Sequence, residues 1–233
     1  MANIPDRARA GRRRAKLNGM GSSGTPMGAT PGQERQAGGT PRAALADLLA
    51  GNRRFVSGRP VHGHDVTAAA AASGDQQPYA VVLGCIDSRV PLEAIFDQTF
   101  GAICVIRTGG HVLDRAVCGS IEYVVGQLGV PLVMVLGHER CGAVAATVEA
   151  LRTGQRPGGS LAHLVDEIAP AVTEAGIDDP AVQPLAIRRH VRRTVRILRE
   201  DDLLAGPVAA GRVAVVGGLY DLATGEVALL DSG

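Results

Sequence analysis

The sequence predicts one α/β domain built on a central, mainly parallel β-sheet with helices on both sides, preceded by a disordered N-terminal tail. Three short runs are apolar at every position, which is typical of strands buried on both faces of a parallel sheet. Helical stretches separate these runs, so strand and helix alternate as in βαβ units. The three apolar runs are residues 79–84, 102–106 and 132–136.

Residues 1–39 form the predicted tail. The segment is rich in Gly, Ala, Arg, Pro and Ser and lacks apolar periodicity, so it cannot bury enough surface to offset the entropy cost of ordering. Its basic cluster, Arg7 to Lys16, is interpreted as solvated; contact with an acidic partner is the alternative, as is a true start at Met20 or Met27. Residues 40–233 then form the single domain.

The elements of the domain follow in order. Thr40 and Pro41 are typical of an N-cap and a first helical position, and they begin an amphipathic helix that ends near Gly58. A late strand is expected at 213–216 and 219–222, followed by a Thr224-Gly225 turn and a hairpin strand at the sheet edge. The other helices are predicted at 68–72, 91–96, 115–128, 142–152, 160–175 and 181–204, and the hairpin strand at 227–230.

Composition excludes several classes of protein. The net charge is only +1, so nucleic-acid binding is not expected, and the six arginines of 181–204 are interpreted as a solvated or oligomer-facing helix surface. No run of 18 apolar residues occurs, so neither a membrane span nor a membrane partner is expected. Four cysteines in a mid-sized chain indicate free thiols in a reducing compartment, hence a cytoplasmic protein.

Metal-binding residue types follow two of the predicted parallel strands. Cys85 ends the first strand, and His138 and Cys141 follow the third. Ligands bind at the carboxyl ends of strands in open α/β sheets, so these three side chains are expected to converge. Thiolate and imidazole suit zinc, and three protein ligands leave a fourth position open, as in a catalytic site.

Asp87 and Arg89 lie close to the predicted metal site. Asp87 is near enough to Cys85 to reach the metal or its bound water, and Arg89 can hold the carboxylate by paired hydrogen bonds. Two alternatives stay open, namely that the cysteines and histidine are ordinary core residues, or that the zinc is structural with Asp87 as its permanent fourth ligand.

The other cysteines and histidines are given no metal role. Cys104 and Cys118 are interpreted as core packing, and the His62 and His64 pair as solvated loop residues. His111 follows the second strand near the site and is interpreted as structural, with proton relay as the alternative. His163 and His190 lie in polar helical stretches and carry no signal.

Two motifs, Cys-Ile-Asp-Ser-Arg-Val-Pro at 85–91 and Gly-His-Glu-Arg-Cys-Gly-Ala-Val at 137–144, resemble the β-class carbonic anhydrases. Further similarity at 51–55, 105–111 and 120–123 extends the resemblance from about 44 to 230. It implies reversible hydration of carbon dioxide to bicarbonate, with zinc-bound hydroxide attacking and one Zn²⁺ per chain. It also implies a homodimer or a dimer-of-dimers tetramer.

By this resemblance each site residue has a role. The zinc ligands are Cys85, His138 and Cys141, and the catalytic dyad is Asp87 with Arg89, where Asp87 also serves as a fourth ligand in a closed state. Gln76 and Gly142 belong to the substrate pocket, with Gln76 brought to that of a neighbouring subunit.

The sequence departs from the family pattern at two places. Thr108 stands where many members have Asn, and Val82 stands where some members carry the Trp of an inhibitory bicarbonate pocket, which argues against that pocket. Two thiolate ligands should make activity rise toward alkaline pH. The alternatives are hydrolysis of carbonyl sulfide or carbon disulfide, and a non-catalytic zinc or bicarbonate-sensing module; a thiol redox protein is weakened by the absence of Cys-x-x-Cys.

Overall fold

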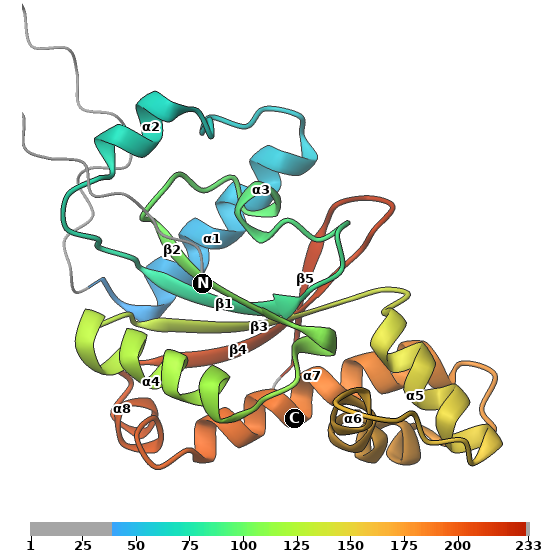
Figure 1. Ribbon diagram of the computed structural model, residues 1–233. Helices are drawn as coiled ribbons and strands as arrows, with labels where there is room; N and C mark the ends of the chain where they lie inside the picture. Colours follow the sequence, from blue (N-terminus) through green and yellow to red (C-terminus); the bar gives the residue numbers. More distant parts are fainter. Residues whose placement is uncertain (1–38, 232–233) are drawn as a thin grey trace, which may run out of the picture.

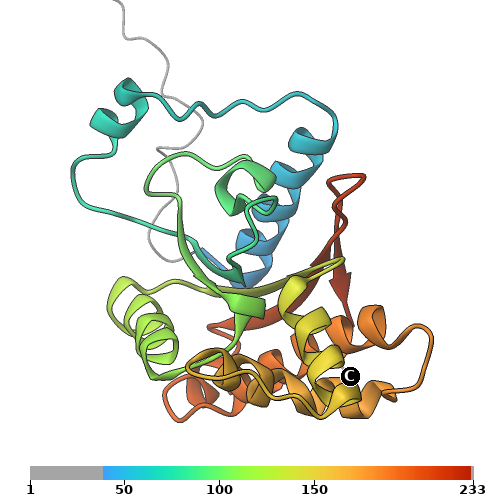
Figure 2. The ribbon, with the colours of Figure 1, turned by 45° about the vertical axis from the view of Figure 1, so that its right-hand side comes forward.

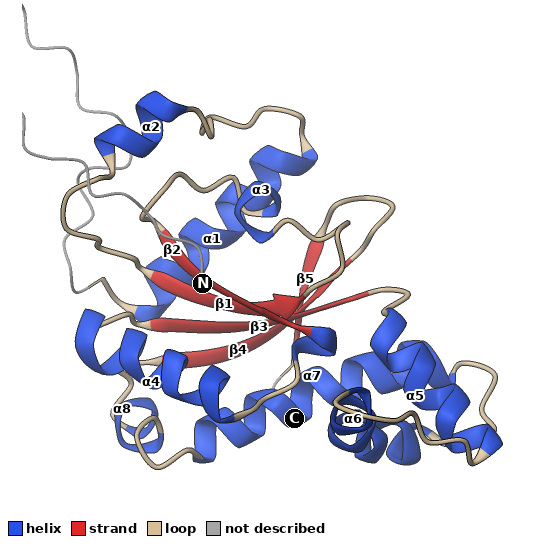
Figure 3. Ribbon diagram, in the orientation of Figure 1, coloured by secondary structure: helices blue, strands red, loops and turns tan. Residues whose placement is uncertain are grey.

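The computed structural model describes residues 39–231 and contains a five-stranded sheet with the order β2-β1-β3-β4-β5 (Figures 1 and 3). Strands β1 to β4 are parallel to their neighbours, and β5 pairs antiparallel to β4 at one edge. The mainly parallel sheet is confirmed; the predicted tail lies outside the described residues, apart from Gly39. The strands are β1 (Ala80–Cys85), β2 (Ile103–Thr108), β3 (Leu132–His138), β4 (Ala214–Tyr220) and β5 (Val227–Leu230).

The helices cover both faces of the sheet, as predicted. Helices α1 to α3 lie on one side and α4 to α8 on the other (Figures 1 and 2). The sheet therefore separates two hydrophobic cores. Within β1, Val82 packs in the core on the side of α1 and α3, Val81 packs in the core on the side of α4 to α7, and every residue of the strand is buried. The helices are α1 (Pro41–Val56), α2 (Val66–Ala71), α3 (Leu92–Ile95), α4 (Arg115–Leu128), α5 (Gly142–Thr153), α6 (Leu161–Ala175), α7 (Val182–Glu200) and α8 (Ala205–Ala209).

Local sequence signals explain where several helices begin and end. The Thr40 hydroxyl accepts a hydrogen bond from the amide of Ala43 at the start of α1. Asp114 caps α4 by accepting from the amide of Val117, and Gly129 ends that helix in the left-handed conformation. Among the described residues, no helix is long and apolar enough to cross a membrane.

Three details differ from the sequence-based prediction. The last long helix ends at Glu200 because the Asp201 carboxylate accepts the amides of Leu203 and Leu204, and the short α8 follows. A 3₁₀ turn, η1 (Gly109–His111), follows β2. The two predicted late segments form one strand, β4, which pairs with β3 without a break through Gly217. A Cβ atom at Gly217 would lie 2.8 Å from a methyl carbon of Val191 on α7, so this position favours glycine.

Candidate metal centre

Three predicted ligands meet where β1 and β3 end. Cys85 is the last residue of β1, His138 is the last residue of the neighbouring β3, and Cys141 directly precedes α5. Their ligand atoms all lie within 4.8 Å of one another, and the two Sγ atoms are 4.0 Å apart. All three residues are buried, so parallel pairing places two thiols and an imidazole in one water-poor cluster.

The donor set fits a zinc ion. Two thiolates bound to one tetrahedral zinc at about 2.3 Å are roughly 3.8 Å apart, close to the spacing of the two Sγ atoms. His138 Nδ1 donates to the Glu139 carbonyl at 2.8 Å, and a carbonyl can only accept, so Nε2 carries the free lone pair. Nε2 is buried without a hydrogen-bond partner among residues 39–231, as expected of an atom that binds a metal.

The contact between the two thiols shifts their pKa values in opposite directions. A hydrogen bond from the Cys141 thiol lowers the pKa of Cys85, although burial opposes the shift, and the same pairing raises the pKa of Cys141. A metal is bound by the thiolate form, so zinc binding at this pair must release the protons that the thiols carry.

Backbone contacts fix the position of the cluster. The Gly110 amide donates to Cys85 Sγ at 3.3 Å. Arg107 donates from Nε to the Cys85 carbonyl at 2.8 Å and from Nη2 to the Asp87 carbonyl at 2.6 Å. Gln183 on α7 donates to the Cys141 carbonyl at 3.3 Å. These contacts tie the ends of β1 and β2, the start of α5 and helix α7 to one point.

Asp87 lies beside the cluster and is paired with Arg89. Arg89 donates from Nε to Oδ1 at 2.9 Å, from Nη2 to Oδ2 at 2.6 Å, and from its backbone amide to Oδ1 at 2.9 Å. These hydrogen bonds hold the pKa of Asp87 well below its usual range. Oδ2 lies 4.0 Å from His138 Nε2, so an ionised carboxylate lies beside the ligand atom of the cluster that carries the free lone pair.

The two residues predicted for the substrate pocket are separated. Gly142 is the first residue of α5, next to Cys141, and a Cβ atom there would meet nothing within 4 Å. Gln76 is exposed and precedes the amino end of β1, whereas Cys85 is at the other end of that strand, which is about 16 Å long at 3.3 Å per residue. Within one chain, Gln76 therefore does not reach the cluster, and its role in a neighbouring subunit stays a prediction.

His190 was given no role from the sequence, but it is buried on α7 and donates from Nε2 to the Gly110 carbonyl at 2.9 Å. Its ring stacks on His111, with the ring centroids 4.4 Å apart. The many arginines of α7 made the helix read as polar in the sequence. The helical spacing of its apolar residues, however, would have placed His190 on the buried face. That face contains Val182, Ala186, Ile187, His190, Val191, Thr194, Val195 and Leu198.

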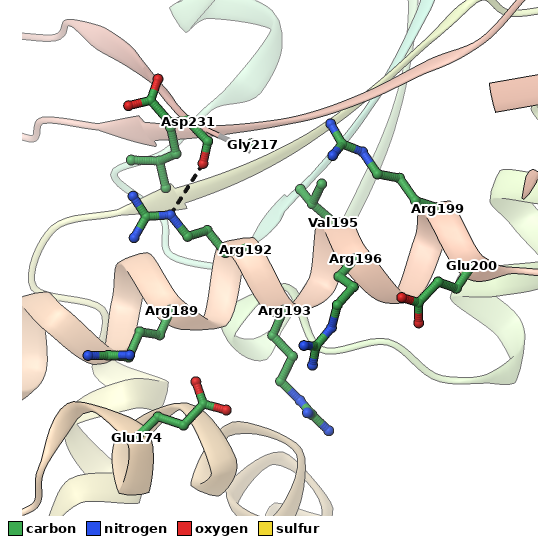
Figure 4. A pocket seen from close by; sticks show the side chains of 11 residues that line it. Glu174, Arg189, Arg192, Arg193, Val195, Arg196, Arg199, Glu200, Gly217 and Asp231 are labelled. Atoms are coloured by element: carbon green, nitrogen blue, oxygen red, sulfur yellow. Dashed lines mark hydrogen bonds between the residues drawn. The ribbon is translucent and has the colours of Figure 1, made fainter. Parts of the chain in front are cut away.

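The opposite, basic face of α7 borders a separate cleft of about 530 Å³ (Figure 4). In Figure 4, Arg192 and Arg199 point toward the sheet, whereas Arg193 and Arg196 point away from it. Arg192 donates to the Asp231 carbonyl and Arg199 to the Val215 carbonyl. The guanidinium groups therefore diverge, and the residues that line this cleft include none of the predicted site residues.

Comparison with known proteins places the chain in one family. The carbonic anhydrase family profile matches residues 80–227. Carbonic anhydrase 2 of Mycobacterium tuberculosis is 45% identical over 193 residues, covering 82% of this chain and 93% of that protein. The carbonic anhydrase of Mycolicibacterium smegmatis is 44% identical over 197 residues, covering 81% and 93%.

Solved structures show the same architecture. A tetrameric β-carbonic anhydrase from Sordaria macrospora superposes with a TM-score of 0.63 at 22% identity, covering 81% of this chain and 95% of that chain. The β-carbonic anhydrase CcaA superposes with a TM-score of 0.62 at 19% identity, covering 80% and 95%. The motifs, the sheet, the cysteine–histidine cluster and these relatives together show that the chain belongs to the β-carbonic anhydrase family.

Proposed function

We propose that Cys85, His138 and Cys141 hold one zinc ion per chain, and that the site hydrates carbon dioxide reversibly to bicarbonate and a proton. The observation that carries this proposal is the bare, buried Nε2 of His138 beside two free thiols. Zinc, when bound, supplies an acidified water molecule that acts as a nucleophile near neutral pH.

Asp87 and Arg89 would orient that nucleophile. Asp87 Oδ2, which lies 4.0 Å from His138 Nε2, would accept a hydrogen bond from the attacking oxygen and so turn a lone pair of that oxygen toward carbon dioxide. Arg89 fixes the carboxylate with three hydrogen bonds and keeps it ionised. Because the pKa of Asp87 is low, the carboxylate orients the hydrogen by a hydrogen bond but does not take it up as a proton. The proton released by the reaction must therefore leave to buffer.

The space beside Cys141 supports a small substrate pocket. Carbon dioxide is apolar and small, and the missing side chain at Gly142 leaves room next to the cluster. In a closed state, Asp87 would instead become the fourth zinc ligand, which requires the three hydrogen bonds from Arg89 to break. X-ray absorption at the zinc edge that gives the same ligand set from acid to alkaline pH would count against this switch.

The assembly and the location of the protein are also proposals. We place Gln76 in the pocket of a neighbouring subunit, because it is exposed and far from the cluster of its own chain. This requires at least a homodimer, and the tetrameric relatives from Sordaria macrospora support a dimer of dimers. The four free cysteines support a reducing compartment, hence the cytoplasm.

Stopped-flow hydration of carbon dioxide with an indicator dye, on zinc-replete protein from mildly acidic to alkaline pH, tests the proposal. Wild type should be active, with the rate rising with pH, whereas Cys141→Ser should lose both zinc and activity. Cys118→Ser is the matched control, because this cysteine lies on α4 outside the cluster, and it should keep both. Wild type that binds zinc but hydrates nothing at any pH would overturn the hydratase and lead to assays with carbonyl sulfide and carbon disulfide.

A further inference from the structure

We propose that His190 is a positioning residue for Cys85 and acts through the backbone of Gly110. This inference rests on the metal site proposed above and assigns a function to a side chain from α7, which lies outside both motifs. The chain of contacts has two links, from the His190 ring to the Gly110 carbonyl and from the Gly110 amide to Cys85 Sγ.

The first link fixes the tautomer of His190. The Gly110 carbonyl can only accept a hydrogen bond, so Nε2 of His190 must carry the hydrogen across the 2.9 Å contact. Burial lowers the pKa of His190 to about 4, so the ring is neutral near pH 7 and Nδ1 is unprotonated. The ring cannot turn over without losing its donor, because Nδ1 has no hydrogen to offer.

The second link joins this ring to the metal ligand. Gly110 has a φ of 62°, and a Cβ atom there would lie 2.9 Å from Ile168 Cδ1 and 3.1 Å from Ala143 Cβ. The residue is therefore held in a left-handed conformation that favours glycine, with its carbonyl bound to His190 and its amide directed at Cys85 Sγ at 3.3 Å. Both groups are attached to the same Cα atom, so the hydrogen bond to His190 limits the shifts of this residue that would move its amide off the sulfur.

The ring of His190 has an aromatic neighbour and, on the same helix, a residue that serves as a control. His111 stacks on the ring with an interplanar angle of 30°. One turn further along α7, the Thr194 hydroxyl donates to the His190 carbonyl at 2.9 Å, a contact that belongs to the helix and not to the ring. Thr194 therefore provides a control at a buried site on the same helix face that does not touch the Gly110 link.

The consequence for the metal is electronic as well as geometric. An N–H···S hydrogen bond stabilises the ionised form of a cysteine, which is the form that binds a metal, and outer-shell partners of metal ligands typically change metal affinity by about 10–100-fold. His190 acts one step further out, so we expect the lower end of that range, about tenfold weaker zinc binding when its donor is removed.

Two substitutions separate the hydrogen bond from the bulk of the side chain. His190→Phe keeps a ring against His111 and removes the donor, whereas His190→Gln keeps an amide donor of similar reach. Zinc affinity of the full-length protein is measured by competition with a chelator. The cobalt-substituted protein reports on the sulfur directly. A thiolate that has lost a hydrogen bond gives up an electron to the metal more easily, so its sulfur-to-cobalt charge-transfer band moves to longer wavelength.

The inference predicts weaker zinc binding and a red-shifted band for His190→Phe, recovery of both in His190→Gln, and wild-type values in Thr194→Val. Wild-type affinity and spectrum in His190→Phe would overturn it, as would equal losses in the Phe and Gln variants. If the Phe variant does not fold, His190→Asn takes its place, since the shorter amide cannot reach Gly110. Wild type that binds no zinc refutes the proposed function instead, so the two failures are distinguishable.

Discussion

Replacing Asp87 with asparagine removes a charge and one acceptor while keeping the shape of the side chain. The carboxylate accepts three hydrogen bonds from Arg89, two of them on Oδ1 and one on Oδ2. An amide has only one acceptor oxygen, and both oxygens of Asp87 accept from Arg89, so the NH₂ group opposes an Arg89 donor in either orientation. If it takes the place of Oδ2, the group that should accept a hydrogen bond from the attacking oxygen also becomes a donor.

The magnitude follows from the proposed role. Proton-directing side chains typically contribute about 10²–10⁴-fold to the rate. Asp87 would orient a proton without retaining it, so we expect the lower end, a fall in kcat/KM of about 10²-fold, or about 2.7 kcal/mol of transition-state stabilisation. Zinc content should not change, because the buried cluster is formed by Cys85, His138 and Cys141 without this residue.

The pH dependence gives a second, independent readout. Arg89 holds the pKa of Asp87 well below its usual range, so the wild-type group stays ionised throughout the assay. The pH profiles of wild type and Asp87→Asn should therefore be parallel, with the same inflection and different heights. A ratio of the two rates that changed near neutral pH would show that Asp87 titrates there and would contradict the reasoning.

The assay is stopped-flow hydration of carbon dioxide, with zinc measured in each sample. Glu93→Gln is the matched control, because it removes an exposed carboxylate from α3, six residues further along the chain, without touching the cluster. A value of kcat/KM for Asp87→Asn within about threefold of this control would refute the orienting role. Loss of zinc from Asp87→Asn would instead favour a fourth-ligand role for the carboxylate.

Three further predictions concern stability. Gly51→Ala should cost about 3 kcal/mol in urea unfolding, because its Cβ would overlap the Phe96 carbonyl, whereas Gly119→Ala, in open space on α4, should gain up to about 1 kcal/mol; equal effects would contradict the packing. Burial lowers the pKa of His190 to about 4 in the folded protein, so between pH 6.5 and 4 this side chain is protonated in the unfolded chain but not in the folded one. The stability advantage of wild type over His190→Gln should therefore shrink by about 2 kcal/mol from pH 7 to pH 5, and a constant difference would refute this. Chelation should lower Tm, and zinc at about 100 times its Kd should restore about 2.7 kcal/mol; an unchanged Tm would argue against a metal in the native state.

Local sequence patterns determined most of the fold. The apolar runs at β1 and β3 could not be exposed on either face, so they had to lie inside a sheet covered by helices. The Thr40-Pro41 pair and Asp114 marked helix starts, because these signals act within one turn of the chain. The sequence predicted the late strand as two segments, and the structure joins them, because Gly217 pairs with Val135 of β3 and packs under Val191 of α7 as part of β4.

The convergence of the cluster was predictable for a similar reason. Cys85 and His138 each end a parallel strand, and parallel pairing necessarily places such ends at one edge of the sheet. The Asp87–Arg89 pair is also local, since the two residues are only two positions apart and the Arg89 backbone takes part in the contact. Residue type and spacing were therefore sufficient to predict which groups meet.

Only the tertiary structure decided the surroundings of the cluster. His190 is 80 positions from Gly110 along the chain, and no local rule relates a helix residue to a turn at that distance. The free lone pair on His138 depends on a hydrogen bond to Glu139, and the exposed place of Gln76 at the opposite end of β1 depends on the direction of the strand. Sequence thus determined the ligands and the sheet through local and strand-end rules, whereas the contacts that orient and tune the ligands required the packing of α7 against the sheet.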